Sequence, residues 1–187
     1  MKSKFRYLID QRSIRMFFLG FSAGLPLLLV FSTLSVWLTK ADIERSTITL
    51  FSWVGFAYSF KFLWTPIVDH FKLPFSDNFG HRKSWLFFSQ VMIIFSLILA
   101  SFSDPNLSLF FMVISFILIA FSSATQDIVI DAFRIESVSQ KLQGALSSMY
   151  LAGYRIAMIV SGAGSLWLVS IQSGETYLLD SWQFVYR

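Results

Sequence analysis

The sequence predicts an all-α integral membrane protein with about five to six transmembrane helices. Of its 187 residues, 55% are hydrophobic and only 14% are charged, whereas an ordinary soluble domain has roughly 25% charged residues. The apolar residues also come in blocks of about twenty, the length that an α-helix needs to cross a bilayer. Blocks of this length exclude a soluble protein with a large core, because core helices have shorter apolar stretches.

The first expected helix covers about residues 14–38 and follows a basic N-terminal segment. A basic start before an apolar run also occurs in signal peptides. This run, however, is about twice as long as the 7–15 residues of a signal-peptide core, and it has no convincing small-residue cleavage site. We therefore expect a retained first helix. The basic residues at its start are Lys2, Lys4, Arg6, Arg12 and Arg15.

Four further apolar segments follow, each close to the length of a membrane span. Pro66 is expected to end or kink the second helix, because proline lacks the backbone N–H that continues a helix. Pro105, in the tight turn "SDPN", marks the start of the fourth helix. The four segments cover about residues 48–68, 84–102, 107–133 and 144–171.

Residues 177–187 resemble the approach to an incomplete sixth helix. Trp182 and Tyr186 are expected at the membrane surface, where tryptophan and tyrosine are enriched. We therefore expect a truncated N-terminal transmembrane bundle over residues 1–187, the front part of a larger protein.

The distribution of basic residues predicts the orientation in the membrane. The N-terminal segment, the loop after the second helix and the loop after the fourth hold five, three and two Lys or Arg residues. The loops on the opposite side hold only Lys40 and Arg45. Because Lys and Arg favour cytoplasmic loops, the N-terminus is expected in the cytoplasm.

Composition also excludes several functions. The formal net charge of +4 comes from residues that flank apolar segments, so no nucleic-acid partner is expected. The chain has no cysteine, and its two histidines, His70 and His81, share one loop, so neither a metal nor a cofactor is expected. A membrane enzyme would need a convergent nucleophile or an acid–histidine set. No such set is evident, and we expect no enzyme.

Four charged residues fall inside or near the apolar segments: Lys61, Asp127, Asp131 and Arg155. Each costs about 2.5–3.5 kcal/mol at the centre of a membrane helix, so they are expected to face one another or a wet cavity. Asp127 and Asp131 are one helical turn apart and share a face. Burial and a neighbouring acid both favour a protonated carboxyl group, whereas arginine stays charged and binds anions bidentately.

This pattern is typical of a proton-coupled or anion-coordinating transporter. It predicts proton coupling at Asp127 and Asp131, and substrate binding at Arg155, Lys61 and Gln126. Structural explanations remain open for each residue. Asp131 can be a solvated helix-end charge, Asp127 and Arg155 can form a structural ion pair, Lys61 can extend to the interface, and Gln126 can join two helices.

Two groups of glycines occur within the helices. Gly20 and Gly24 form a G-x-x-x-G pair, and Gly162 and Gly164 lie in "VSGAGS". Small residues let membrane helices approach closely, and this is the role that we expect. A hinge or a cavity is the alternative.

The loop after the second helix contains Asp69, Gly80, Arg82 and Lys83. It is similar to the acid–glycine–basic loop that occupies this place in the major facilitator superfamily and is thought to latch the two halves of the transporter. The resemblance implies that these four residues are gating elements. The spacing from Asp69 to Gly80 is wider than usual, and an ordinary positive-inside loop is the alternative.

Longer motifs narrow the resemblance to the AmpG-type muropeptide permeases, which are related to acetyl-coenzyme A transporters. The specific blocks are "KFLW-x-P-x-x-D" and "S-A-x-Q-D-I-x-x-D-A", and "LGFSAGLPLLL" and "GYRIAMIVSGAGSLWL" extend the likeness over almost the whole chain. The resemblance implies a fold like the N-terminal half of a major facilitator superfamily transporter. It also implies uptake of anhydro-muropeptides across the bacterial inner membrane by symport with protons, for peptidoglycan recycling.

The length departs from this family. Its members have twelve or more helices in two halves, with the cargo between the halves. The expected partners are therefore the small-molecule cargo, protons, membrane lipid and a complementary C-terminal half. An inactive remnant of a truncated gene, or a related carrier for another anion such as acetyl-coenzyme A, stays open.

Overall fold

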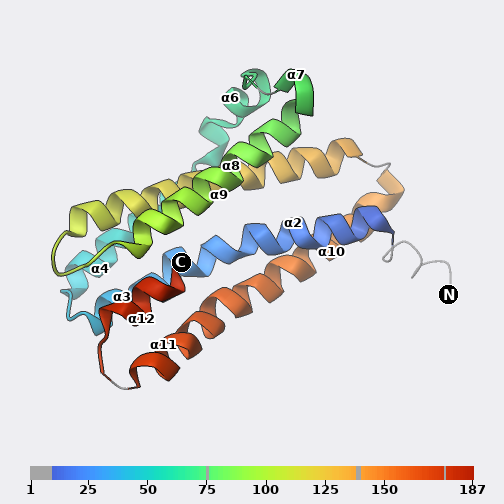
Figure 1. Cartoon of the computed structure of the whole chain (residues 1–187). Helices are drawn as coiled ribbons and strands as arrows, with labels where there is room; N and C mark the ends of the chain where they lie inside the picture. The colour runs from blue at the N-terminus through green and yellow to red at the C-terminus, as the bar shows by residue number, and fades with distance from the viewer. Residues whose placement is uncertain (1–9, 75, 138–139, 175) are drawn as a thin grey trace.

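Long helices that run side by side make up most of the chain (Figure 1). The computed structural model describes residues 10–74, 76–137, 140–174 and 176–187. Every regular element in these ranges is helical, so the predicted all-α fold is confirmed, and the architecture is consistent with one half of a transporter of the major facilitator type. The basic residues Lys2, Lys4 and Arg6 lie outside the described residues.

Four helical stretches are long and apolar enough to cross a membrane. They correspond to the first, third, fourth and fifth predicted helices, and each extends beyond its predicted range at one end or both because capping and polar residues continue the helix past the apolar block. Their elements are α2 (Gln11–Leu28), η1 (Leu29–Thr33) and α3 (Leu34–Lys40); α8 (His81–Ser101); α9 (Leu109–Ser137); and α10 (Gln140–Ile159), η4 (Val160–Gly164) and α11 (Ser165–Ser173).

The second predicted helix differs from the continuous span expected over residues 48–68, because it is broken into short pieces. Phe60 and Trp64 adopt φ angles of −97° and −106°, which leave the helical region. Pro66 lies in the first turn of the last piece and cannot donate a hydrogen bond to the preceding turn. The pieces are α4 (Arg45–Phe51), η2 (Ser52–Gly55), α5 (Phe56–Ser59), η3 (Lys61–Leu63) and α6 (Thr65–His70).

Glycines set the closest helix contact, between α2 and α10. A β carbon at Gly20 would meet the backbone of Tyr150, and one at Gly153 would meet the backbone of Phe17. The two helices therefore lie backbone to backbone (Figure 1). The close contact expected of Gly20 and Gly24 is present in the structure.

Both helices of this pair contain a π-helical turn at matching positions, η1 and η4. A π turn shifts the backbone hydrogen bonds by one residue and frees carbonyl groups for other donors. Thr33 Oγ1 donates to the Ser161 carbonyl oxygen at 3.1 Å, and Tyr186 Oη donates to that of Leu29 at 2.9 Å. The first bond joins the two π turns, and the second joins η1 to the C-terminal residues.

The C-terminal helix α12 (Leu179–Val185) packs into the bundle. Trp182 stacks on Trp37 with the rings 6.2 Å apart, and Trp182 and Tyr186 are only 3% and 2% exposed. Both rings lie in the main hydrophobic core beside Phe116, and their expected place at the membrane surface stays a prediction. Tight burial of these residues fixes the end of the chain against the first helix.

Candidate transport site

Helix α9 carries a group of polar and charged residues in its second half. Gln126, Asp127, Asp131 and Arg134 occupy its second half, spaced by one, four and three residues. Asp127, Asp131 and Arg134 follow helical spacing and therefore share one face, while Gln126 points to a neighbouring face. This face meets the broken second segment and α10.

Gln126 joins α9 to α2. It is 1% exposed, and its Nε2 donates to Ser22 Oγ at 2.6 Å. Such a bond satisfies a polar group where no water is present, as expected of a glutamine between membrane helices. The structure places Gln126 in helix packing, and its contact with cargo stays a prediction.

Asp131 lies between two cations. Its carboxylate is 3.9 Å from Lys61 Nζ and 3.1 Å from Arg134 Nη2. The side chains of Lys61 and Asp131 are 36% and 44% exposed, so these pairs are open to the surroundings of the bundle. The ion pair with Lys61 connects α9 to the broken second segment across seventy residues of sequence. The structure thus brings two of the predicted site residues together.

Asp127 lies one turn deeper, among tyrosines. Tyr150 Oη donates to Asp127 Oδ1 at 3.5 Å, and Lys61 and Asp131 are the charged groups that act on Asp127. Tyr58 Oη lies nearby and faces the buried hydroxyl group of Ser123. A half-buried carboxyl group beside hydroxyl groups and one lysine can exchange a proton without leaving its place.

Arg155 stays apart from this cluster. It is exposed and forms no ion pair with a described residue. Gly153, two residues before it, faces α2, and two residues turn an α-helix by about 200°. Arg155 therefore points away from the α2 contact, to the outside of the described bundle.

Two of the predicted gating residues, Asp69 and Arg82, meet at the C-terminal end of the second segment. Arg82 Nη1 is 2.6 Å from Asp69 Oδ1, and Arg82 Nη2 is 2.8 Å from Glu136 Oε1. The wide spacing between Asp69 and Gly80 is taken up by a short helix, α7 (Ser76–Phe79). Gly80 precedes α8 with φ of 85°, a conformation that glycine adopts at no steric cost.

Lys83, the fourth predicted gating residue, follows Arg82 but forms no ion pair with a described residue. The arginine therefore makes a clamp between the end of α6 and the end of α9, and the lysine is left exposed. Gating itself stays a prediction for all four residues.

Several residues of the site were missed by the sequence interpretation. Arg134 and Glu136 lie in the stretch "DAFRIE". Arg134 is three residues from Asp131, and this helical spacing was the available signal; Glu136 is five residues away and gave none. Nothing in the sequence indicated that Tyr58 and Tyr150 belong to the site. Tyrosines in membrane spans also occur in the packed core, so their presence alone does not mark a functional site. Among the described residues, no group of three or more His, Asp or Glu side chains could hold a metal ion.

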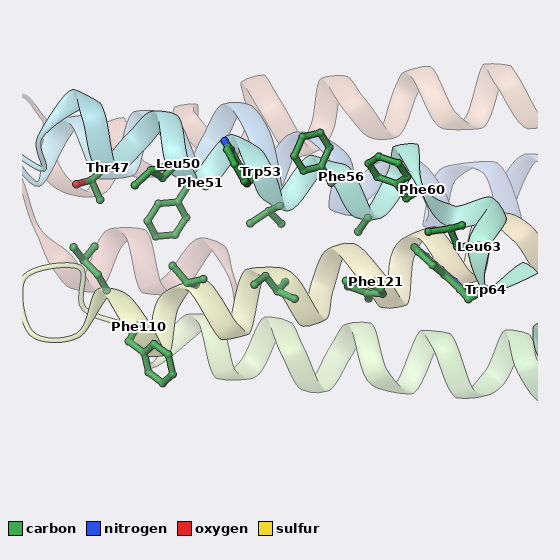
Figure 2. A pocket seen from close by; sticks show the side chains of 15 residues that line it. Thr47, Leu50, Phe51, Trp53, Phe56, Phe60, Leu63, Trp64, Phe110 and Phe121 are labelled. Atoms are coloured by element: carbon green, nitrogen blue, oxygen red, sulfur yellow. The ribbon is translucent and has the colours of Figure 1, made fainter.

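An apolar groove of about 620 Å³ lies between the broken second segment and α9. Figure 2 shows the aromatic side chains of Trp53, Phe56 and Phe60 along one wall and Phe121 on the other. At its end, Trp64 Nε1 donates to Thr125 Oγ1 at 3.2 Å and separates the groove from the charged cluster. This groove has almost no polar partner for a hydrophilic cargo.

Comparison with known proteins identifies the family. The model of the family described as acetyl-coenzyme A transporter 1 matches residues 14–183. The chain belongs to this family. Its relatives are AmpG-type transporters: it is 40% identical to a putative transporter AmpG 4 of Rickettsia felis over 95% of the chain, and 40% identical to an anhydromuropeptide permease of Escherichia coli K12 over 90% of the chain.

The AmpG-type resemblance predicted from the motifs is therefore confirmed. These relatives are longer: the chain spans 41% of the Rickettsia protein and 34% of the Escherichia coli protein. Permeases move their substrates without converting them, in agreement with the expectation of a transporter and not an enzyme. The apolar helices and the permease relatives make this a multi-pass membrane protein of the AmpG type.

Proposed function

We propose that this chain is part of a proton-coupled transporter that takes up anhydro-muropeptides across the bacterial inner membrane. The observation that carries the proposal is the cluster of Lys61, Asp127 and Asp131 within the membrane-spanning bundle. Asp127 lies nine residues from the end of its span at Glu136, or about 14 Å, near the middle of a bilayer core. Charges at this depth mark substrate or proton pathways.

The chemistry of the cargo fits these residues. A muropeptide carries sugar hydroxyl groups and the carboxylates of its peptide. An arginine at bilayer depth binds a carboxylate bidentately. Arg155 on α10 is exposed and forms no ion pair with a described residue, so it is free to do so. Because an arginine facing acyl chains would be costly, the outer face of α10 is expected to border a wet cavity or another part of the transporter.

Coupling to protons is assigned to Asp127. When its carboxyl group is charged, it competes with Asp131 for the ammonium group of Lys61. When Asp127 is protonated, the ammonium group of Lys61 can pair with Asp131 alone or with an anionic cargo. Proton uptake would in this way change the charge offered to the substrate, with Arg134 holding Asp131 in place.

The clamp of Arg82, Asp69 and Glu136 is assigned to gating. It ties α6, α8 and α9 together at one end of the bundle, and Gly80 gives the loop its sharp entry into α8. By the positive-inside rule, this end and the N-terminus face the cytoplasm. Opening of the transporter on this side would break the clamp.

Alternating access requires a second half, and we propose a complementary C-terminal half as the partner of this chain. Uptake of a labelled anhydro-muropeptide would be measured in cells that produce this chain with and without a candidate second half. We expect uptake only with both. Absence of uptake in both cases, with rapid degradation of the chain, would instead indicate an inactive remnant.

Two variants of the assembled transporter test the residue roles. Arg155→Ala should abolish uptake while leaving the amount of protein in the membrane unchanged, and Lys40→Ala, an exposed cation at a helix end, is the control. Asp127→Asn should remove the dependence of uptake on the proton gradient. Normal uptake by Arg155→Ala, or an unchanged pH dependence in Asp127→Asn, would return that residue to a structural role.

A carrier for acetyl-coenzyme A is the second candidate, favoured by the description of the matching family. Its phosphates would also suit Arg155 and Lys61. Competition in vesicles separates the two candidates, because excess unlabelled acetyl-coenzyme A should leave muropeptide uptake unchanged if the first proposal is right.

A further inference from the structure

A second charged site lies at the end of the bundle where α2 and α8 begin. A groove of about 410 Å³ runs there between α2, α8 and α9. Among the described residues, its lining contains three cations and no acidic side chain. Apolar side chains form the remainder of the wall together with Ser22 and Gln90. The residues used below are Arg15, Arg82, Lys83, Gln90, Phe18 and Phe133.

The three cations differ in their partners. Arg82 is neutralised by its ion pairs with Asp69 and Glu136, neither of which is among the lining residues. Arg15 and Lys83 are exposed and form no ion pair with a described residue. Two uncompensated cations on one groove create a positive potential that favours an anion.

The depth of these cations matches the headgroup layer of a membrane. Arg15 is four residues from the start of α2 and Lys83 is two from the start of α8, or about 6 Å and about 3 Å along the axes. Phe18, one turn deeper than Arg15, is 64% exposed. The cations thus lie above an apolar surface that faces outward from the bundle.

Lys83 also borders a second pocket. This pocket measures about 460 Å³ and is lined by Phe79, Ser84 and Phe87 on the other side of the lysine. Lys83 thus lies between two apolar grooves. A lipid could place its phosphate against this cation and one acyl chain in each groove. Gln90, seven residues beyond Lys83 and about 10 Å deeper, could donate to an ester carbonyl group.

We propose that this groove binds an acidic diacyl phospholipid, with its phosphate between Arg15 and Lys83. One acyl chain lies along Phe18 and Phe133 and the other enters the pocket beside Phe87. A zwitterionic headgroup is disfavoured because no acidic residue in the described part of the chain lines the groove to receive its ammonium group. A small soluble anion would make no contact with the apolar walls.

The bound lipid would rest against the Arg82 clamp and stabilise its closed form.

The test uses the absence of cysteine from the chain. Phe18→Cys is labelled with a fluorophore, and the chain is placed in phosphatidylcholine vesicles that contain either brominated phosphatidylglycerol or brominated phosphatidylcholine. A label at Phe110→Cys, which is outside the groove and 75% exposed, is the control. Since each basic residue near an acidic surface favours binding about fivefold, brominated phosphatidylglycerol should bind between about 5-fold and 25-fold more tightly at Phe18.

This preference should disappear in Arg15→Gln/Lys83→Gln and persist in Arg15→Lys/Lys83→Arg, with Lys40→Gln/Arg45→Gln as the matched control. In the unsubstituted chain, the preference for phosphatidylglycerol should also weaken as salt is added. This measurement requires no change at Arg15 or Lys83. Equal quenching by the two lipids at Phe18, or a preference retained in the neutral double variant, would overturn the proposal. Loss of the preference in a few millimolar inorganic phosphate would assign the groove to a soluble anion and overturn it as well.

Discussion

Replacement of Gly153 by alanine should push α2 and α10 apart. The added β carbon would contact the Phe17 carbonyl oxygen and lie 2.9 Å from both the Phe17 carbonyl carbon and the Phe21 backbone nitrogen. All three atoms belong to the backbone and cannot rotate away as a side chain would. We therefore expect the two helices to separate or the variant to lose stability.

The magnitude follows from a comparison with Gly144→Ala. Both glycines lie in α10, but a β carbon at Gly144 would meet no atom within 4 Å. Alanine in place of glycine in a helix gains about 0.5–1 kcal/mol at either site, so this gain cancels in the difference between the variants. What remains is the overpacking cost of about 1–3 kcal/mol, and Gly153→Ala should be less stable than Gly144→Ala by that amount.

The assay is unfolding of the purified chain in mixed micelles by added sodium dodecyl sulfate, followed by far-ultraviolet circular dichroism. Gly20→Ala, on the opposite helix, should behave like Gly153→Ala because its β carbon would contact the Tyr150 backbone. Equal midpoints for Gly153→Ala and Gly144→Ala would refute the close backbone contact that this reasoning requires.

Two further predictions concern the ends of the bundle. Arg82→Gln removes both ion pairs of the clamp. Since these pairs are partly exposed, the loss should destabilise the clamp by about 1 kcal/mol. The destabilisation should appear as faster hydrogen exchange at the end of α6. Lys40→Gln, an exposed cation at the other end of the first span, is the control. Equal exchange in the two variants would count against the clamp. Tyr186→Phe removes the hydrogen bond to the Leu29 carbonyl and should lower stability by about 1 kcal/mol. An unchanged unfolding midpoint would show that water or another donor replaces the hydroxyl group.

The sequence alone predicted the membrane class, four of the long helices and the family. Length and hydropathy suffice for the membrane class and the helices, because the bilayer imposes the same span on every helix. The family followed from the longer motifs, such as "KFLW-x-P-x-x-D". Motifs within one helix were also predictable: Asp127 and Asp131 share a face by spacing alone. The broken second segment was predicted only in part. Pro66 indicated a kink, but no sequence feature indicated the breaks at Phe60 and Trp64.

Only the tertiary structure decided which helix faces meet. It paired Lys61 with Asp131, Arg82 with Glu136 and Gln126 with Ser22, over 70, 54 and 104 residues of sequence. In a soluble helix, polar and apolar faces reveal which side is buried. In a membrane helix the side that faces lipid and the side that faces protein are both apolar. The sequence therefore determined that charged groups lie at bilayer depth, and the packing determined their partners.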